Sequence, residues 1–152
     1  MSDRTRGKQP VAPNLYQPLT FEPYQGPLIL CVCEPPGPSA RKVLWTLKEA
    51  GYRVRVQPLR ADRITEHLLA GYRAAVLVMN PAEEAGYEIC RAIRSLSALP
   101  ILVVCEARPG DDVLRILETG ADSYLVVPFS QSEFLARIYA LIRPSLQDQL
   151  PV

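Results

Sequence analysis

Long apolar runs are missing from this sequence. None of its 152 residues belongs to a hydrophobic stretch of the roughly 20 residues that a membrane-spanning helix needs. The polar residues 1–9 also lack the apolar core of a secretory signal. We therefore expect a cytoplasmic protein that makes no contact with a membrane.

A strong net charge is missing as well. The chain carries 17 lysines and arginines against 16 aspartates and glutamates, which gives a formal net charge of +1 at pH 7. Without a broad electrostatic field, composition gives no reason to expect direct binding of nucleic acid. The hydrophobic fraction of 48% is typical of a globular protein. The chain is long enough for one domain and too short for two.

Patterns of metal-binding and disulfide-forming residues are also absent. The chain has one histidine, His67, and no C-x-x-C pair. Its four cysteines all lie in apolar segments: Cys31, Cys33, Cys90 and Cys105. We interpret them as small core residues in a reducing compartment, and we expect no metal and no other cofactor.

Prolines, by contrast, are plentiful near the N-terminus. Residues 1–27 hold five of the 15 prolines and show neither helical nor strand periodicity. We predict an extended or disordered tail over 1–27, one domain over 28–146 and a short C-terminal tail over 147–152.

From Leu28 onward, short apolar runs alternate with amphipathic segments. The runs predict strands over 28–33, 53–56, 74–79, 101–104 and 123–127. Helices are predicted from a cap at Ser39 to Gly51, briefly over 64–69, around 89–96, over 111–119 and from a capping box at 130–133 onward. Nearly wholly apolar strands that alternate with helices imply an α/β, doubly wound, five-stranded parallel sheet with helices on both faces. In such sheets the working site lies at the carboxyl ends of the central strands.

Two motifs in the second half of the chain are specific. Residues 120–129 read Gly-Ala-Asp-Ser-Tyr-Leu-Val-Val-Pro-Phe, and residues 86–94 begin a helix with Gly-Tyr-Glu. The first resembles the Gly-Ala-Asp-Asp-Tyr-Leu-x-Lys-Pro-Phe motif of the receiver domain of bacterial response regulators, and the second resembles the start of that family's third helix. The resemblance implies a flavodoxin-like fold with strand order 2-1-3-4-5 and a cis peptide bond before Pro128. It also implies a role in two-component phosphorelay signal transduction.

The same resemblance places unusual residues in the family's phosphorylation pocket. The acidic pair for Mg²⁺, the phosphoacceptor aspartate, the hydroxyl residue and the lysine correspond in turn to Cys33 with Glu34, Val78, Cys105 and Val127. A shift of two residues would put Asn80 at the acceptor position, and an amide is no phosphoacceptor either. Phosphoryl transfer needs an attacking oxygen, a metal and a cation. We therefore predict a pseudo-receiver that is not an enzyme and whose pocket is filled by valine and cysteine side chains.

Recognition of a partner is the function that this interpretation leaves. Receiver domains usually bind a signalling protein or a second receiver through the fourth helix, fifth strand and fifth helix, here 111–119, 123–127 and 130 onward. Tyr124 is either the switch aromatic of that surface or a strand aromatic packed at the sheet edge. Trp45 and Tyr139 are further candidate interface residues.

Two other functions stay open. One is a redox sensor that uses Cys33 and Cys105, although these would lie about 9 to 10 Å apart, too far for an unstrained disulfide. The other is a domain that binds a small ligand in the apolar pocket.

Overall fold

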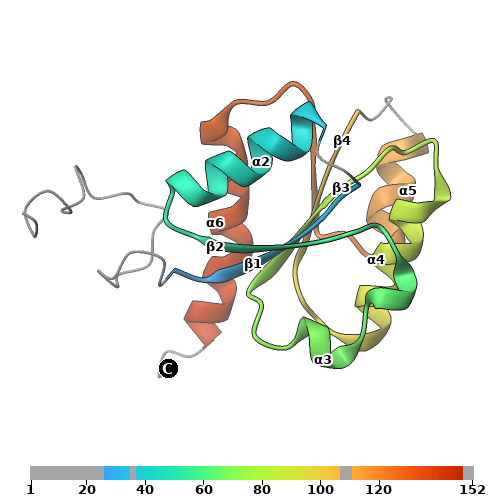
Figure 1. The fold of residues 1–152 in the computed structure, drawn as a ribbon, viewed down its shortest axis with the longest axis horizontal. Coiled ribbons are helices and arrows are strands. Elements are labelled where there is room, and N and C mark those ends of the chain that lie inside the picture. Colours follow the sequence, from blue (N-terminus) through green and yellow to red (C-terminus); the bar gives the residue numbers. More distant parts are fainter. Residues whose placement is uncertain (1–25, 35–36, 107–110, 149–152) are drawn as a thin grey trace, which may run out of the picture.

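The computed structural model describes residues 26–34, 37–106 and 111–148 (Figure 1). Apart from Gly26 and Pro27, the predicted N-terminal tail lies outside the described residues, as do residues 149–152. No helix in the described part of the chain is long and apolar enough to cross a membrane.

Five parallel strands form one sheet. They are β1 (Leu28–Val32), β2 (Arg53–Gln57), β3 (Ala74–Val78), β4 (Ile101–Cys105) and β5 (Ser123–Val126). Their spatial order is β2-β1-β3-β4-β5. The predicted doubly wound sheet and its strand order are therefore confirmed.

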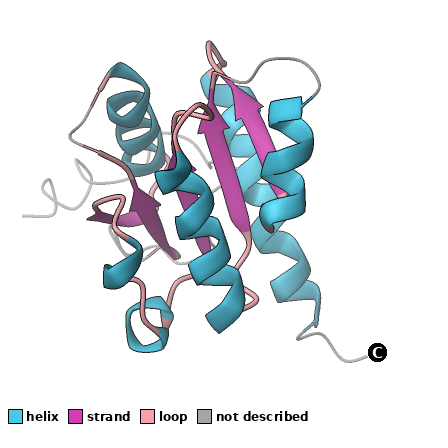
Figure 2. Ribbon diagram, turned by 90° about the vertical axis from the view of Figure 1, so that its right-hand side faces the viewer, coloured by secondary structure: helices cyan, strands magenta, loops and turns pink. Residues whose placement is uncertain are grey.

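Helices cover both faces of this sheet (Figures 1 and 2). They are α2 (Pro38–Glu49), the 3-10 turn η1 (Ala61–Arg63), α3 (Glu66–Leu69), α4 (Glu84–Leu96), α5 (Asp111–Thr119) and α6 (Gln131–Asp148). Helices α2 and α6 pack on one face and share a hydrophobic cluster with it, the α2/α6 cluster. Helices α3, α4 and α5 pack on the other face around a second cluster, the α4/α5 cluster.

The predicted N-cap of α2 was wrong by two residues. The N-cap is Gly37 and Pro38 opens the helix, without a side-chain cap from Ser39. Proline suits this first helical position because its missing N–H would have no partner there. The start of α6 was predicted correctly, since the Ser130 hydroxyl accepts a hydrogen bond from the Glu133 amide at 3.0 Å.

The second helix is shorter than predicted. Ile64 follows η1 with extended backbone angles and lies outside α3, which has only four residues. Thr65 caps α3 by accepting a hydrogen bond from the Leu68 amide at 3.0 Å. This local cap fixes the helix start beyond Ile64, whose side chain is buried in the α4/α5 cluster.

Candidate functional site

A cleft of about 480 Å³ opens at the carboxyl ends of β1, β3 and β4. This is the place where the chain leaves β1 for one face of the sheet and β3 for the other, the usual location of a binding site in such folds. All five residues that the sequence assigns to the pocket line it: Cys33, Glu34, Val78, Cys105 and Val127. The expectation that valine and cysteine side chains would fill the pocket was wrong. Val78 and Val127 are only half-buried, so the space above them stays open to solvent.

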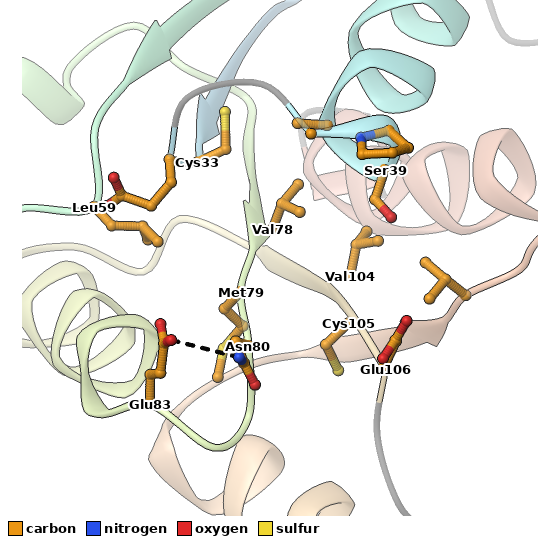
Figure 3. Close-up of a pocket in the computed structure, with 15 residues that line it drawn as sticks. Cys33, Ser39, Leu59, Val78, Met79, Asn80, Glu83, Val104, Cys105 and Glu106 are labelled. Carbon is orange, nitrogen blue, oxygen red and sulfur yellow. Dashed lines mark hydrogen bonds between the residues drawn. The ribbon is translucent and has the colours of Figure 1, made fainter.

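Val78 occupies the central position of the cleft. It is the last residue of β3 and lies in register with Val104 of β4. Figure 3 shows these two side chains in the middle of the site, with Cys33 and Cys105 on either side. Val78 packs against the α2/α6 cluster and offers only hydrocarbon to the cleft.

Asn80, two residues beyond Val78, shapes the turn into α4. Its side-chain oxygen accepts a hydrogen bond from the Ala82 amide at 2.9 Å, and its amide nitrogen lies 3.5 Å from the Glu83 carboxylate (Figure 3). Both ends of the side chain are therefore engaged in a local turn, a common use of asparagine.

The two cleft thiols belong to opposite faces of the sheet. Cys33 packs in the α2/α6 cluster and Cys105 in the α4/α5 cluster. Strand β3 lies between the strands that carry them. Both are free thiols in this structure. Two strand spacings and opposite orientations are incompatible with a disulfide between them.

The cysteines differ in their acidity. Cys31 lies two residues before Cys33 on the same face, and its thiol hydrogen bond to the Cys33 sulfur lowers the pKa of Cys33 to about 7, against the opposing effects of burial and of the Glu34 charge. The same pairing raises the pKa of Cys31. Burial raises the pKa of Cys105 to about 11 and that of Cys90 to about 11. Cys33 is thus the thiol with the largest thiolate fraction near neutral pH.

Val127, which the receiver resemblance aligns with the family's lysine, lies just after β5. Its amide donates to the Cys105 carbonyl at 3.0 Å, and the Val127–Pro128 bond is cis. Lys42 of α2, which the sequence did not point to, lies beside Phe129. Its ammonium group donates to the Phe129 carbonyl and sits 4.5 Å from the centre of the Phe129 ring. Lys42 thereby ties α2 to the loop after β5.

Magnesium, the ion that the receiver resemblance makes relevant, does not fit the side chains of the cleft. The carboxylates here belong to Glu34, Glu83 and Glu106 on the exposed rim. Nowhere in the described ranges do three or more metal-binding side chains gather into a group that could hold a metal ion. A hard dication requires several oxygen ligands, and a thiol and a methyl group are poor substitutes for them.

The opposite, amino end of the sheet holds a polar network. The Asp122 carboxylate accepts hydrogen bonds from the Ile101 amide and from the Arg94 guanidinium, both at 2.8 Å. Arg94 also donates to three backbone carbonyl oxygens, those of Ser97, Leu99 and Gly120. The Gly-Ala-Asp motif thus joins α4 to the beginnings of β4 and β5, and Arg94 is a partner that sequence reasoning missed.

The predicted interface aromatics lie in different places. Tyr124 is half-buried against the α4/α5 cluster. Trp45 on α2 is 54% exposed and Tyr139 on α6 is 39% exposed. On α5 and β5 the structure adds three exposed apolar side chains that the sequence did not single out: Leu114 and Leu117 of α5 and Val126 of β5. Leucines next to the apolar stripe of a helix look like part of that stripe in the sequence. Their exposure therefore could not be predicted from the sequence.

Comparisons with known proteins found similar sequences and similar folds. No family model matches the chain. It is 33% identical over 107 residues to the cell cycle response regulator CtrA of Brucella ovis, across 70% of this chain and 46% of CtrA. The chain therefore spans less than half the length of this curated relative.

Solved structures match about three quarters of this chain. A two-component response regulator from Clostridium difficile superposes with a TM-score of 0.63 and 18% identity, over 78% of this chain and 98% of that one. The described domain has the receiver fold. A second receiver-fold structure, from a sensor histidine kinase of Pseudomonas aeruginosa, has a TM-score of 0.61, 24% identity and the same coverage of 78% and 98%, and it has a magnesium ion coordinated in its active site cleft. The chain is therefore similar to CtrA over part of its sequence and shares the receiver fold with these solved structures.

Proposed function

We propose that this chain is a receiver domain that acts in signal transduction through protein–protein contact, without phosphorylation. The observation that carries the proposal is the valine at the end of β3. Val78 supplies no oxygen to attack a phosphoryl group, and Cys105 and Val127 supply neither the hydroxyl nor the ammonium group that would bind one. On this proposal the domain is not an enzyme, and it works in the cytoplasm, where buried thiols stay reduced.

The contact surface that we propose is formed by α5, β5 and α6. Leu114 and Leu117 are 56% and 40% exposed, and their i, i+3 spacing places them on one side of α5. Val126 of β5, at 37% exposure, adds an exposed apolar side chain on the neighbouring strand, and Tyr139 is the exposed aromatic of α6. A twofold pairing of two copies would bury the same residues from both, so we propose a homodimer or a regulatory partner at this surface.

Tyr124 is then a packing residue of this surface and not a phosphate-dependent switch. Its ring already contacts the α4/α5 cluster from β5. Without a phosphoryl group in the cleft, nothing there would draw the cleft residues toward a second arrangement.

Sedimentation of the full chain over a range of concentrations tests this proposal. We expect a concentration-dependent dimer whose dissociation constant is unchanged by acetyl phosphate and Mg²⁺. The variant Leu114→Asp should weaken the dimer about tenfold or more, because a carboxylate would be buried at the interface. Trp45→Asp, an equally exposed change on α2, is the matched control and should leave the dimer intact. A dimer that forms only with acetyl phosphate and Mg²⁺ would contradict the proposal.

Two alternatives each have one supporting observation. The lowered pKa of Cys33 favours a reactive thiol, although a disulfide with Cys105 is sterically excluded. The open cleft leaves room for a small apolar ligand, and a thermal-shift screen with a specific hydrophobic binder would support that function.

A further inference from the structure

The outer side of β2 presents open backbone groups. In a parallel ladder, alternate residues direct both their N–H and their C=O toward the same neighbouring strand. The Arg53 amide donates to the Pro27 carbonyl and the Gln57 carbonyl accepts from the Cys33 amide, so Arg53, Arg55 and Gln57 face β1. Val54 and Val56 therefore direct their N–H and C=O groups outward. Among the described strands, β2 pairs with β1 alone.

The side chains of β2 make one face of this edge basic and the other apolar. They alternate between the two faces, with Arg53, Arg55 and Gln57 on one and Val54 and Val56 on the other. Val54 packs against the α2/α6 cluster, whereas the Val56 side chain is 51% exposed. An exposed valine beside open amides is the arrangement that another strand can extend.

Positive charge surrounds this edge. Residues 51–65 contain four arginines and a single acidic residue, Asp62. Asp62 pairs with Arg60 at 2.9 Å, which lowers the pKa of the Asp62 carboxyl. Arg55 and Arg63 form no ion pair with any residue in the described ranges. The charge that remains favours an acidic partner.

The N-terminal segment of the chain is a poor match for this edge. Residues 1–25 contain Pro10, Pro13, Pro18 and Pro23, which have no N–H to donate to a ladder. That segment also has more basic than acidic side chains, and it would be repelled by the arginines. A segment without these prolines and with acidic side chains would therefore come from another protein.

We propose that the open edge of β2 binds an extended, acidic segment of a partner protein as an additional strand. Acidic side chains at alternating positions of that segment would face Arg53 and Arg55, and the apolar side chains next to them would lie on the same face as Val54 and Val56. This surface lies at the opposite edge of the sheet from β5 and is independent of the α5, β5 and α6 surface.

A pair of designed peptides tests this inference on the full chain. One alternates glutamate with valine and the other alternates lysine with valine. Fluorescence anisotropy should show binding of the glutamate peptide only, weakened by added salt. Amide hydrogen exchange should slow at Val54 and Val56 on binding, with no change at Arg55, whose amide already faces β1.

Three variants separate the backbone contribution from the charge. Arg55→Glu should weaken the glutamate peptide about tenfold and create binding of the lysine peptide. Val56→Pro removes an outward N–H and should abolish binding while leaving the ladder to β1 intact. Val56→Thr keeps the N–H and the strand preference and serves as its control.

Several results would overturn the inference. Equal binding of the two peptides would do so, as would no binding of the glutamate peptide or unchanged exchange at Val54 and Val56 at saturation. Slow exchange of these amides in the free chain that is lost on deletion of residues 1–25 would assign the edge to the chain's own segment instead. The charge exchange with Arg55→Glu keeps the test valid should Val56→Pro fail to fold.

Discussion

The two ends of the sheet differ in their polar side chains. At the amino end, Asp122 and Arg94 bind each other and several backbone groups. At the carboxyl end, Val78 and Val127 line an open cleft with hydrocarbon side chains. Both regions lie in segments that resemble receiver domains. The amino end has a hydrogen-bonded polar network, whereas the carboxylates of the carboxyl end, such as Glu34, lie on the exposed rim of the cleft. The comparison teaches that residues that hold a fold together and residues that perform its chemistry are separable. On the proposed function, this chain carries the receiver fold without the phosphorylation reaction.

The largest effect is expected at the amino end. Arg94→Ala removes the partner of the Gly120, Ser97 and Leu99 carbonyl oxygens and of Asp122, and we expect a loss of about 2–3 kcal/mol in the free energy of unfolding. Urea unfolding measures it. Arg91→Ala is the matched control on the same helix, because Arg91 makes only an exposed pair with Glu84 at 3.7 Å and should change stability by about 0.5 kcal/mol or less. Equal losses in the two variants would remove the distinction between the ends.

A charge placed at the carboxyl end should have a smaller effect, and one that depends on pH. Val78→Asp puts a carboxyl group among half-buried apolar side chains, and we expect a loss of about 1–2 kcal/mol at neutral pH. Burial raises the folded-state pKa of such a carboxyl above its unfolded value. The loss should therefore be small below about pH 4 and grow as the pH rises toward neutrality.

Urea unfolding across this pH range, with and without Mg²⁺, measures the Val78→Asp effect. Val78→Asn is the uncharged control and should show no such pH dependence. Recovery of the lost stability by millimolar Mg²⁺ would show that the cleft supplies metal ligands after all, contrary to the account.

The smallest change concerns the thiols of the cleft. With Cys33 at a pKa of about 7 and Cys105 at about 11, a disulfide reagent should label Cys33 first, with a rate that rises through pH 7. Cys31→Ala removes the hydrogen bond to Cys33 and should move that midpoint toward the ordinary value of 9.0. Mass spectrometry of labelled peptides measures both, with Cys90→Ala as the control.

The same shift predicts a sign for the effect on stability. A folded-state pKa below the unfolded one stabilises the protein above the unfolded pKa, and this contribution is lost as the pH falls through the folded pKa. Cys31→Ala should therefore cost more stability at pH 9 than at pH 6, as urea unfolding can show. A midpoint that stays near 7 in Cys31→Ala would contradict the role of the pair.

Periodicity predicted the fold well because the central strands are nearly wholly apolar and the longer helices have a buried stripe. The runs containing Leu28, Ala74 and Ile101 became central strands, and the alternation at Val54 and Val56 became an edge. Boundaries that depend on local caps were less predictable, as Gly37 and Ile64 show.

The site was predictable in its residues but not in its shape. Alignment to the receiver motifs found five of the residues that line the cleft, because strand ends converge there. It missed the openness of the cleft, which depends on how far Val78 and Val127 reach toward the exposed rim. It also missed Arg94 and Lys42, since their partners are backbone carbonyl groups that have no signature in the sequence.

The most direct test of the account is the intact mass of the full chain after incubation with acetyl phosphate and Mg²⁺. A receiver domain that keeps its aspartate and lysine serves as the positive control under the same conditions. We predict no added phosphoryl group on this chain while the control is modified. Stoichiometric phosphorylation, mapped to a carboxylate of the cleft such as Glu34 or Glu83, would contradict the account.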